Sequence, residues 1–282
     1  MIQASSQQLS GNGESWSCNR PISTYFRVMQ ASLVIPIKEL SGAKQRLSGI
    51  LDPLQREDLC RAMIEDMLEV ASTCDQIAQV LVVTSDPSVA ELVASYGAEI
   101  LPEPDQPGLI NAVTHASREL ARTGVKVMMF LPGDTPLVSI EELEVVLGGM
   151  SAPDQAEFLI VPASDLGGSN CVVCSPPDCM EFGFGEDSFR RHLGIARARG
   201  IEPAVLKLPG IGLDIDTPED VEELVERIVA NNIESHTYRF LAQHGFLKMP
   251  RETKSHTRFE EQVSQVALSE QPISEKVSNV SD

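Results

Sequence analysis

A near-continuous apolar run at residues 125–131 constrains the fold of this chain more than any other feature. Gly124 precedes the run and Pro132-Gly133 follows it, and its length suits a strand better than a helix. A strand that is apolar at nearly every position is typical of the interior of a parallel sheet, where both faces are covered. Asp134 comes directly afterwards, so we expect its carboxylate at the carboxyl edge of the sheet, where open α/β sheets bind ligands. Gly-Asp-x-Pro is also ordinary turn chemistry, so closing a turn is the alternative role for Asp134.

Strand and helix patterns alternate along residues 33–230 and predict a three-layer α/β fold with a mostly parallel sheet in one domain. Strands are expected at 33–37, 80–84, 99–101, 125–131, 158–162, 171–174 and 204–207, and helices at 53–71, 86–97, 109–122, 139–148, 189–200 and 217–230. Capping boxes are predicted for the pairs Asp52/Gln55, Ser139/Glu142 and Thr217/Asp220.

The two ends of the chain lack this alternation. Residues 1–31 are polar and unpatterned, which predicts a disordered extension, and Met29 is an alternative translation start. The predicted domain spans 32–230. Residues 231–282 are expected to hold one more helix, around Tyr238 and Phe240, before a disordered tail.

The formal net charge of -19, from 41 acidic and 22 basic residues, argues against nucleic acid or an anionic membrane as a partner. No run has the length of a transmembrane helix, and no signal peptide is recognisable. Cys171 and Cys174 have the spacing of metal ligands, but three positions along a strand put them on opposite faces. We therefore interpret the six cysteines as free thiols and expect a cytoplasmic protein.

Asp214 and Asp216 lie two apart in an extended segment, so their carboxylates are expected to point to the same side. Together with Asp134 they offer oxygen ligands to a hard cation. Magnesium takes one or two carboxylates and keeps several waters, which suits this set. The structural alternative is that one of them only precedes the helix at 217–230.

Two further segments carry candidate anion-binding groups. The loop at residues 38–46 follows the first strand and contains Lys38, Lys44 and Arg46, which could reach phosphate oxygens, although it is not a Walker A loop. A solvated basic loop is the alternative. Gly185 and Ser188 begin a helix whose first turn is basic, which indicates an anion, and Ser169 could add a hydroxyl. His192 is interpreted as a core or substrate-orienting residue rather than a base.

These motifs occur in a fixed order: Pro36-x-Lys38 with Ala43-Lys44-x-Arg46-Leu47, Asn111, Gly133-Asp134-x-Pro136, Asp165-x-Gly167-Gly168-Ser169-Asn170, Phe184-Gly185-x-x-Ser188-Phe189 and Asp214-x-Asp216-x-Pro218-x-Asp220. The set resembles the guanylyltransferase family of coenzyme F420 biosynthesis (the 2-phospho-L-lactate guanylyltransferases and their relatives) over residues 32–230. Ser169 stands where threonine is common in that family, and Ile110 precedes Asn111 where leucine is common.

The resemblance implies a nucleotidyltransferase fold of the molybdopterin-guanylyltransferase kind, and an enzyme that joins GTP to a phosphorylated three-carbon acid and releases pyrophosphate. It implies magnesium at Asp134, Asp214 and Asp216, and the phosphate of the acid near Ser169, Gly185 and Ser188. We hypothesise that Lys44 and Arg46 stabilise the departing pyrophosphate, and that Asn111 and the proline-rich loop at 102–108 contact guanosine. Lys38 is counted with the substrate-binding residues.

Several alternatives stay open. The acid is 2-phospho-L-lactate, phosphoenolpyruvate or (R)-3-phosphoglycerate, and a homodimer or direct hand-over of the product to the next enzyme of the F420 pathway is compatible with the sequence. Another nucleotidyltransferase of the same fold, such as a molybdopterin guanylyltransferase, is the competing enzyme. A non-catalytic GTP-binding regulator is the competing class, but it gives no reason for three aspartates at one edge.

Overall fold

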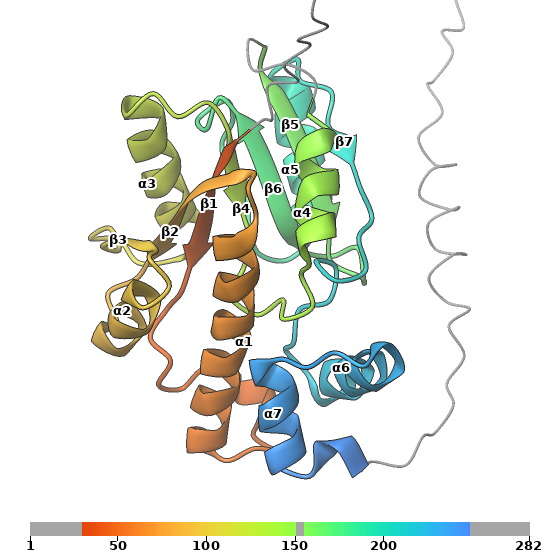
Figure 1. The fold of residues 1–282 in the computed structure, drawn as a ribbon. Helices are drawn as coiled ribbons and strands as arrows, with labels where there is room; N and C mark the ends of the chain where they lie inside the picture. The colour runs from red at the N-terminus through yellow and green to blue at the C-terminus, as the bar shows by residue number, and fades with distance from the viewer. Residues whose placement is uncertain (1–29, 151–154, 249–282) are drawn as a thin grey trace, which may run out of the picture.

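The computed structural model describes residues 30–150 and 155–248, in which seven strands form one sheet with the order β3-β2-β1-β4-β6-β5-β7 (Figure 1). The strands are β1 (Ala31–Pro36), β2 (Ile77–Val83), β3 (Glu99–Leu101), β4 (Met128–Phe130), β5 (Glu157–Pro162), β6 (Ser169–Ser175) and β7 (Ala204–Val205). Only β6 runs against its neighbours, β4 and β5. The predicted mostly parallel α/β sheet is therefore confirmed.

Helices cover both faces of this sheet and complete the three layers (Figure 1). They are α1 (Pro53–Thr73), α2 (Pro87–Ala94), α3 (Leu109–Arg122), α4 (Ile140–Gly148), α5 (Ser188–Ala198), α6 (Pro218–Asn231) and α7 (His236–Gln243), with short 3-10 turns η1 (Gln45–Leu47) and η2 (Phe246–Lys248). None of the helices in these ranges is long and apolar enough to cross a membrane.

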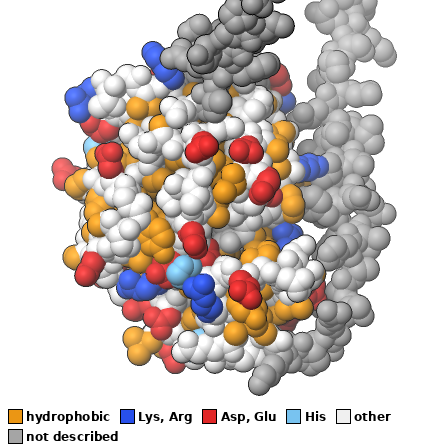
Figure 2. Space-filling view, in the orientation of Figure 1, with side chains coloured by type: hydrophobic (Ala, Val, Ile, Leu, Met, Phe, Trp, Pro, Cys, Tyr) orange, Lys and Arg blue, Asp and Glu red, His pale blue; other side chains and the backbone are white. Residues whose placement is uncertain are grey.

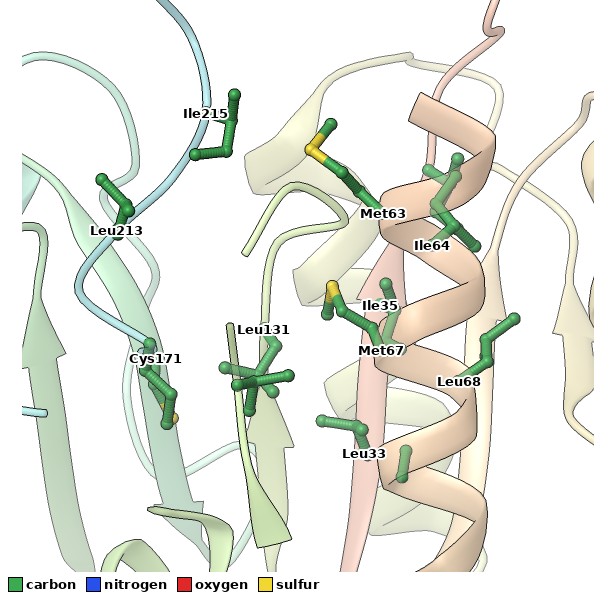
Figure 3. Packing of buried hydrophobic residues seen from close by; sticks show 14 of the residues in the cluster. Leu33, Ile35, Met63, Ile64, Met67, Leu68, Leu131, Cys171, Leu213 and Ile215 are labelled. Carbon is green, nitrogen blue, oxygen red and sulfur yellow. The ribbon is translucent and has the colours of Figure 1, made fainter. Parts of the chain in front are cut away.

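Two separate cores result, one on each face of the sheet. On one face α1 packs over β1, bringing Met63 and Met67 against Leu33 and Ile35 (Figure 3). On the other face α3 and α5 cover the sheet. Burial of apolar area at about 25 cal/mol per Å² is the main force that holds such layers together.

β4 lies at the centre of the sheet and is buried on both sides, as its apolar run predicts. Met129 belongs to the α1 core and Phe130 to the α3–α5 core, because successive side chains along a strand alternate. The strand is shorter than the predicted run, and it pairs in parallel with β1 but antiparallel with β6. This antiparallel pair places the start of β6 beside the end of β4, at the edge where Asp134 follows.

The same alternation explains the cysteines of β6. Cys171 is buried in the first core and Cys174 in the second, so the two thiols cannot share a metal ion. Both are free, as are the other cysteines in the described ranges. The interpretation of this pair as buried thiols is confirmed.

Residues beyond the predicted domain boundary at 230 pack against the domain. α7 lies on α1, with Leu241 fully buried in the first core, and Asp66 of α1 accepts hydrogen bonds from the first amides of α7, those of His236 and Thr237, at 2.6 and 3.0 Å. A carboxylate at a helix amino terminus satisfies amides that have no partner within the helix. The extension at 1–29, with Cys18 and Met29, and the tail after 248 lie outside the described residues.

Candidate functional site

Lys44 lies between two of the predicted aspartates, and this contact is the centre of the site. Its Nζ atom is 2.5 Å from Oδ2 of Asp134 and 2.7 Å from Oδ1 of Asp216. The side chain of Lys44 is 9% exposed, whereas Asp134 is 26% and Asp216 42% exposed. Burial disfavours the charged ammonium, but the charges of the two aspartates outweigh it and hold the pKa of Lys44 above its usual value. Lys44 is therefore a cation at neutral pH.

The loop that carries Lys44 adopts a backbone conformation that is uncommon for this residue type. Lys44 has φ 51°, in the left-handed region, at the start of η1. Arg56, buried on α1, holds the loop in place by donating hydrogen bonds to the carbonyls of Ala43 and Leu51 at 3.1 and 3.0 Å. Such strained residues persist only where the surroundings fix them, and they are frequent at functional sites.

The segment that carries Asp214 and Asp216 is extended, and its side chains alternate as predicted. Leu213 and Ile215 point into the first core (Figure 3), so the two aspartates face away from it. The amide of Ile215 donates to the carbonyl of Asp134 at 3.1 Å and joins this segment to the one after β4. All three predicted aspartates therefore lie at one edge of the sheet.

Asp214 is held by Asn170 rather than by Lys44. Nδ2 of Asn170 donates to Oδ1 of Asp214 and to the carbonyl of Ile211, both at 3.0 Å. Asn170 has no partner in the register of β5, which pairs Val161 with Cys171 and Pro162 with Ser169. This bulge re-aims the side chain at the edge of the sheet. Burial raises the pKa of Asp214, with the charges of Asp134 and Asp216 acting in the same direction and the bond from Asn170 against it.

Glu142 fixes the chain just before Asp214. Its carboxylate accepts the amides of Gly210 and Ile211 at 2.7 and 2.8 Å. The Ser139/Glu142 capping box was therefore wrong in its second half: Ser139 does accept from the amide of Glu142, but the Glu142 side chain turns away to these distant amides. The capping boxes of α1 and α6 are confirmed.

The donor set fits a divalent cation in part. Oδ1 of Asp134 is buried and has no hydrogen-bond partner among the described residues, which suits a hard cation that prefers carboxylate oxygens. The three aspartates do not bring ligand oxygens within 4.8 Å of one another; within 30–150 and 155–248, the group that does so is Asp66, Glu69 and His236, at α1 and α7. Asp134 and Asp216 share Lys44 as a partner, whereas Asp214 is bonded to Asn170.

A second group of polar side chains forms where β6 begins and α5 starts. Oγ of Ser169 is 2.9 Å from Nδ1 of His192 and 3.1 Å from Oγ of Ser188. His192 is fully buried, with its ring edge-on to Phe184 at 4.8 Å between centroids. Burial, together with the charge of Arg191, lowers the pKa of His192 from 6.5 to about 4. The imidazole is therefore neutral at pH 7.

The basic first turn of α5 has internal partners. Arg190 pairs with Asp187 at 2.7 Å, and Arg191 donates to the carbonyls of residues 183, 184 and 186. The amide of Ser188 bonds to the carbonyl of Gly185, and the amide of Phe189 to that of Gly167. The arginines therefore do not by themselves indicate an anion.

The other predicted residues lie along the same edge but make fewer contacts. Arg46 is 73% exposed and 3.6 Å from Asp216. Lys38 is exposed after β1, and Gly185 has φ 111° in the turn before α5. Asn111 lies in the first turn of α3, where Nδ2 is 3.5 Å from the carbonyl of Pro107. Acidic side chains are spread over the face shown in Figure 2, and basic ones are fewer there.

Sequence reasoning missed the residues that position the site. The sequence around Arg56 also suits a helix face, that around Glu142 a helix cap, and that around Asn170 a strand. Their partners are far away in the chain, so spacing gave no signal. His192 was noticed, but its contact with Ser169 was not.

Comparison with solved structures identifies the fold. The chain resembles a protein described as a nucleotide-diphospho-sugar transferase, from Desulfovibrio desulfuricans, with a TM-score of 0.64, 18% identity, and coverage of 78% of this chain and 96% of that one. A nucleotidyl transferase from Methanothermobacter thermautotrophicus gives a TM-score of 0.55 at 14% identity, covering 72% and 99%. At these identities the likeness shows the fold, which is the nucleotidyltransferase type predicted from the sequence.

Sequence comparison then gives the family. Residues 31–264 match the family described as "Guanylyl transferase CofC like", so this chain belongs to that family. It is 32% identical over 202 residues to the phosphoenolpyruvate guanylyltransferase of Conexibacter woesei, covering 72% of this chain and 90% of the relative. The 3-phospho-D-glycerate guanylyltransferase of Colwellia psychrerythraea is 33% identical (70% and 91%), and the 2-phospho-L-lactate guanylyltransferase of Methanothermobacter thermautotrophicus is 32% identical (70% and 85%). The suspected family is thereby confirmed, and three different acids are represented among its relatives.

Proposed function

We propose that this guanylyltransferase joins GTP to a phosphorylated three-carbon acid and releases pyrophosphate. The observation that carries the proposal is the meeting of Lys44 with Asp134 and Asp216 at the carboxyl edge of the sheet. In a protein of net charge -19, a buried cation among carboxylates at this edge suits a site for a polyanion and its counter-ions. Family membership supports the same reaction.

The attacking group in such a reaction is a phosphate oxygen, which is ionised at neutral pH, so a strong general base is not needed. This agrees with His192, which is neutral and engaged at both ring nitrogens. Catalysis then depends on alignment and on neutralising charge. Lys44, with Arg46 beside it, would stabilise the negative charge that develops on the departing pyrophosphate.

A magnesium ion would be held by Asp134 and Asp216, with Asp214 as the third carboxylate. Bound there, it would neutralise phosphate oxygens and act as a Lewis acid. The chain's own part is to fix these carboxylates, through Asn170 on Asp214 and Glu142 on the preceding backbone.

We assign the acid to the Ser169, Ser188 and Gly185 region, and guanosine to Asn111 with the loop at 102–108. Lys38 is close enough in sequence to Lys44 to serve the phosphates from the other end of the same loop. The three candidate acids differ by one hydroxyl, one double bond or the position of the phosphate.

The decisive experiment measures pyrophosphate release from GTP and magnesium with 2-phospho-L-lactate, phosphoenolpyruvate and (R)-3-phosphoglycerate offered separately. We expect release with at least one acid and none in its absence. Release with none of them, while GTP still binds, would refute the proposal and favour a molybdopterin-type enzyme or a GTP-binding regulator.

The variant Asp216→Asn tests the metal assignment. It keeps the shape of the side chain but removes its charge, so turnover should fall by at least about 100-fold, as for loss of a transition-state contact, with the melting temperature little changed. Thr217→Ser, one residue away and outside the carboxylate set, is the matched control. Normal activity of Asp216→Asn at ordinary magnesium would remove Asp216 from the metal site.

A further inference from the structure

Ser169, Ser188 and His192 form a buried chain of hydrogen bonds. Nδ1 of His192 contacts the hydroxyl of Ser169, which contacts the hydroxyl of Ser188. On the other side of the ring, the backbone amide of Gly183 donates to Nε2 at 2.9 Å. All three side chains are buried, so water does not compete for these bonds.

The amide of Gly183 fixes the tautomer of His192. A backbone N–H can only donate, so Nε2 must present its lone pair and carries no hydrogen. The neutral ring then has its hydrogen on Nδ1, and Nδ1 donates to the hydroxyl oxygen of Ser169; the backbone of Ser188 is a further hydrogen-bond partner of the ring. A hydrogen bond to one ring nitrogen is the usual way in which a protein sets which imidazole nitrogen is protonated.

Counting hydrogens shows what this tautomer does to the serines. His192 Nδ1, Ser169 and Ser188 bring three polar hydrogens, and the two contacts between these groups use two of them. One hydroxyl hydrogen is left over, whichever serine donates to the other. In the opposite tautomer Ser169 would donate to Nδ1, Ser188 would donate to Ser169, and none would remain.

The position of Ser169 and Ser188 in the fold indicates where a ligand could accept the leftover hydroxyl hydrogen. Ser169 is the first residue of β6, next to Asn170, whose side chain holds Asp214. Ser188 is the first residue of α5, after the Gly185 turn. The pair therefore stands at the same edge of the sheet as the aspartates. A buried hydroxyl hydrogen without an acceptor is costly, so an acceptor from a ligand would be favoured there.

We infer that His192 is a positioning residue that makes the Ser169–Ser188 pair a hydrogen-bond donor to an ionised oxygen of the phosphorylated acid. This inference rests on the proposed function, and it assigns a role to a buried residue that need not touch the substrate. An anionic oxygen accepts hydrogen bonds and donates none, so the fixed tautomer favours an anion over a neutral hydroxyl at this point.

The tautomer is tested directly, without any substrate, on the full chain labelled with ¹⁵N-histidine. The five histidines are distinguished by comparison with His192→Asn, which removes one signal. We expect the nitrogen shifts of a ring protonated at Nδ1 at pH 7. A signal from a ring protonated at Nε2, or from an imidazolium, would overturn the inference whatever the enzyme's activity.

Kinetics test the consequence for the acid. His192→Leu removes the donor to Ser169, whereas His192→Asn can present an amide hydrogen near the position of Nδ1. We expect His192→Leu to raise KM for the acid about tenfold, as for loss of one hydrogen bond to a charged group, with KM for GTP nearly unchanged and most of the loss recovered in His192→Asn. Equal defects in the two variants, or equal effects on both substrates, would contradict a positioning role.

A double-mutant cycle tests whether His192 acts through Ser169. If it does, adding His192→Leu to Ser169→Ala should change KM for the acid no further. Ser117→Ala, a buried serine of α3 that bonds to the carbonyl of Thr114, is the control for loss of a buried hydroxyl. Additive effects would refute the coupling. Inhibition by inorganic phosphate and by pyruvate, each measured on wild type and on His192→Leu, shows which anionic group is the acceptor.

The two proposals fail in different ways. If wild-type protein releases no pyrophosphate with any of the three acids, the proposed function is refuted, while the nitrogen shifts still report the tautomer. If the wild type is active and the KM values for the acid do not respond to His192 or Ser169, only the present inference is refuted.

Discussion

Replacing Lys44 by methionine tests the centre of the site most directly. Methionine keeps much of the buried stem but removes the charge between Asp134 and Asp216. Breaking a fully buried ion pair costs about 3 to 5 kcal/mol, and an exposed pair contributes about 0.2 to 1 kcal/mol. The pair with Asp134 is closer to the first case, and the pair with the 42%-exposed Asp216 is closer to the second.

We therefore expect Lys44→Met to lower the free energy of unfolding by about 2 kcal/mol, which is about 4 to 8 °C in melting temperature for a domain of this size. If Lys44 serves the departing pyrophosphate as proposed, losing its charge should lower kcat by a further about 100- to 1000-fold. Lys44→Arg should recover stability better than activity, because it restores a positive charge beside the two carboxylates but not the compact ammonium at the same point.

Urea unfolding and pyrophosphate release, measured on the same preparations, separate the two effects. Lys38→Met is the matched control, since Lys38 is exposed in the same loop and should leave the unfolding curve unchanged. If Lys44→Met unfolds like the wild type and keeps its kcat, then the ion pairs neither hold the loop nor serve the reaction, and Lys44 is not part of the active site.

Three further predictions concern the scaffold. Because folding lowers the pKa of His192 to about 4, the unfolded chain binds a proton between pH 6.5 and 4 that the folded chain does not. The free energy of unfolding should therefore fall by up to about 3 kcal/mol as the pH drops through this window. Urea unfolding of His192→Asn should lack that part of the pH dependence. Gly210→Ala would push a Cβ into the carbonyl oxygen of Leu137, so it should lower the free energy of unfolding by about 3 kcal/mol. A Cβ added at Gly148 meets nothing within 4 Å, so Gly148→Ala should be neutral or slightly stabilising. Calorimetry measures both. Asp66→Ala removes the acceptor of two α7 amides, so it should lower the free energy of unfolding by about 2 kcal/mol and speed hydrogen exchange in α7. Asp58→Ala, at an exposed position of α1, is the control. Unchanged exchange would show that α7 docks without Asp66.

Local patterns were sufficient for most of the fold. The helix at Leu109–Arg122 and the strand at Glu99–Leu101 lie where the sequence predicts them, and the caps of α1 and α6 form as expected. These features depend on neighbours within about four residues, where periodicity and side-chain caps act. The expectation that Asp214 and Asp216 share one side also needed only the alternation of an extended chain.

Contacts between distant segments could not be predicted in this way. The sequence offered Lys44 as a phosphate ligand, but only the folded chain brings its ammonium to Asp134 and Asp216, 90 and 172 positions away. Glu142 was given a local cap and instead holds Gly210, because two unpaired amides of a distant loop lie within its reach. The sequence by itself determined the layers, the carboxyl edge and the family's residues at that edge. The tertiary structure decided which of those residues touch, since a buried polar group takes whatever partner the packing supplies.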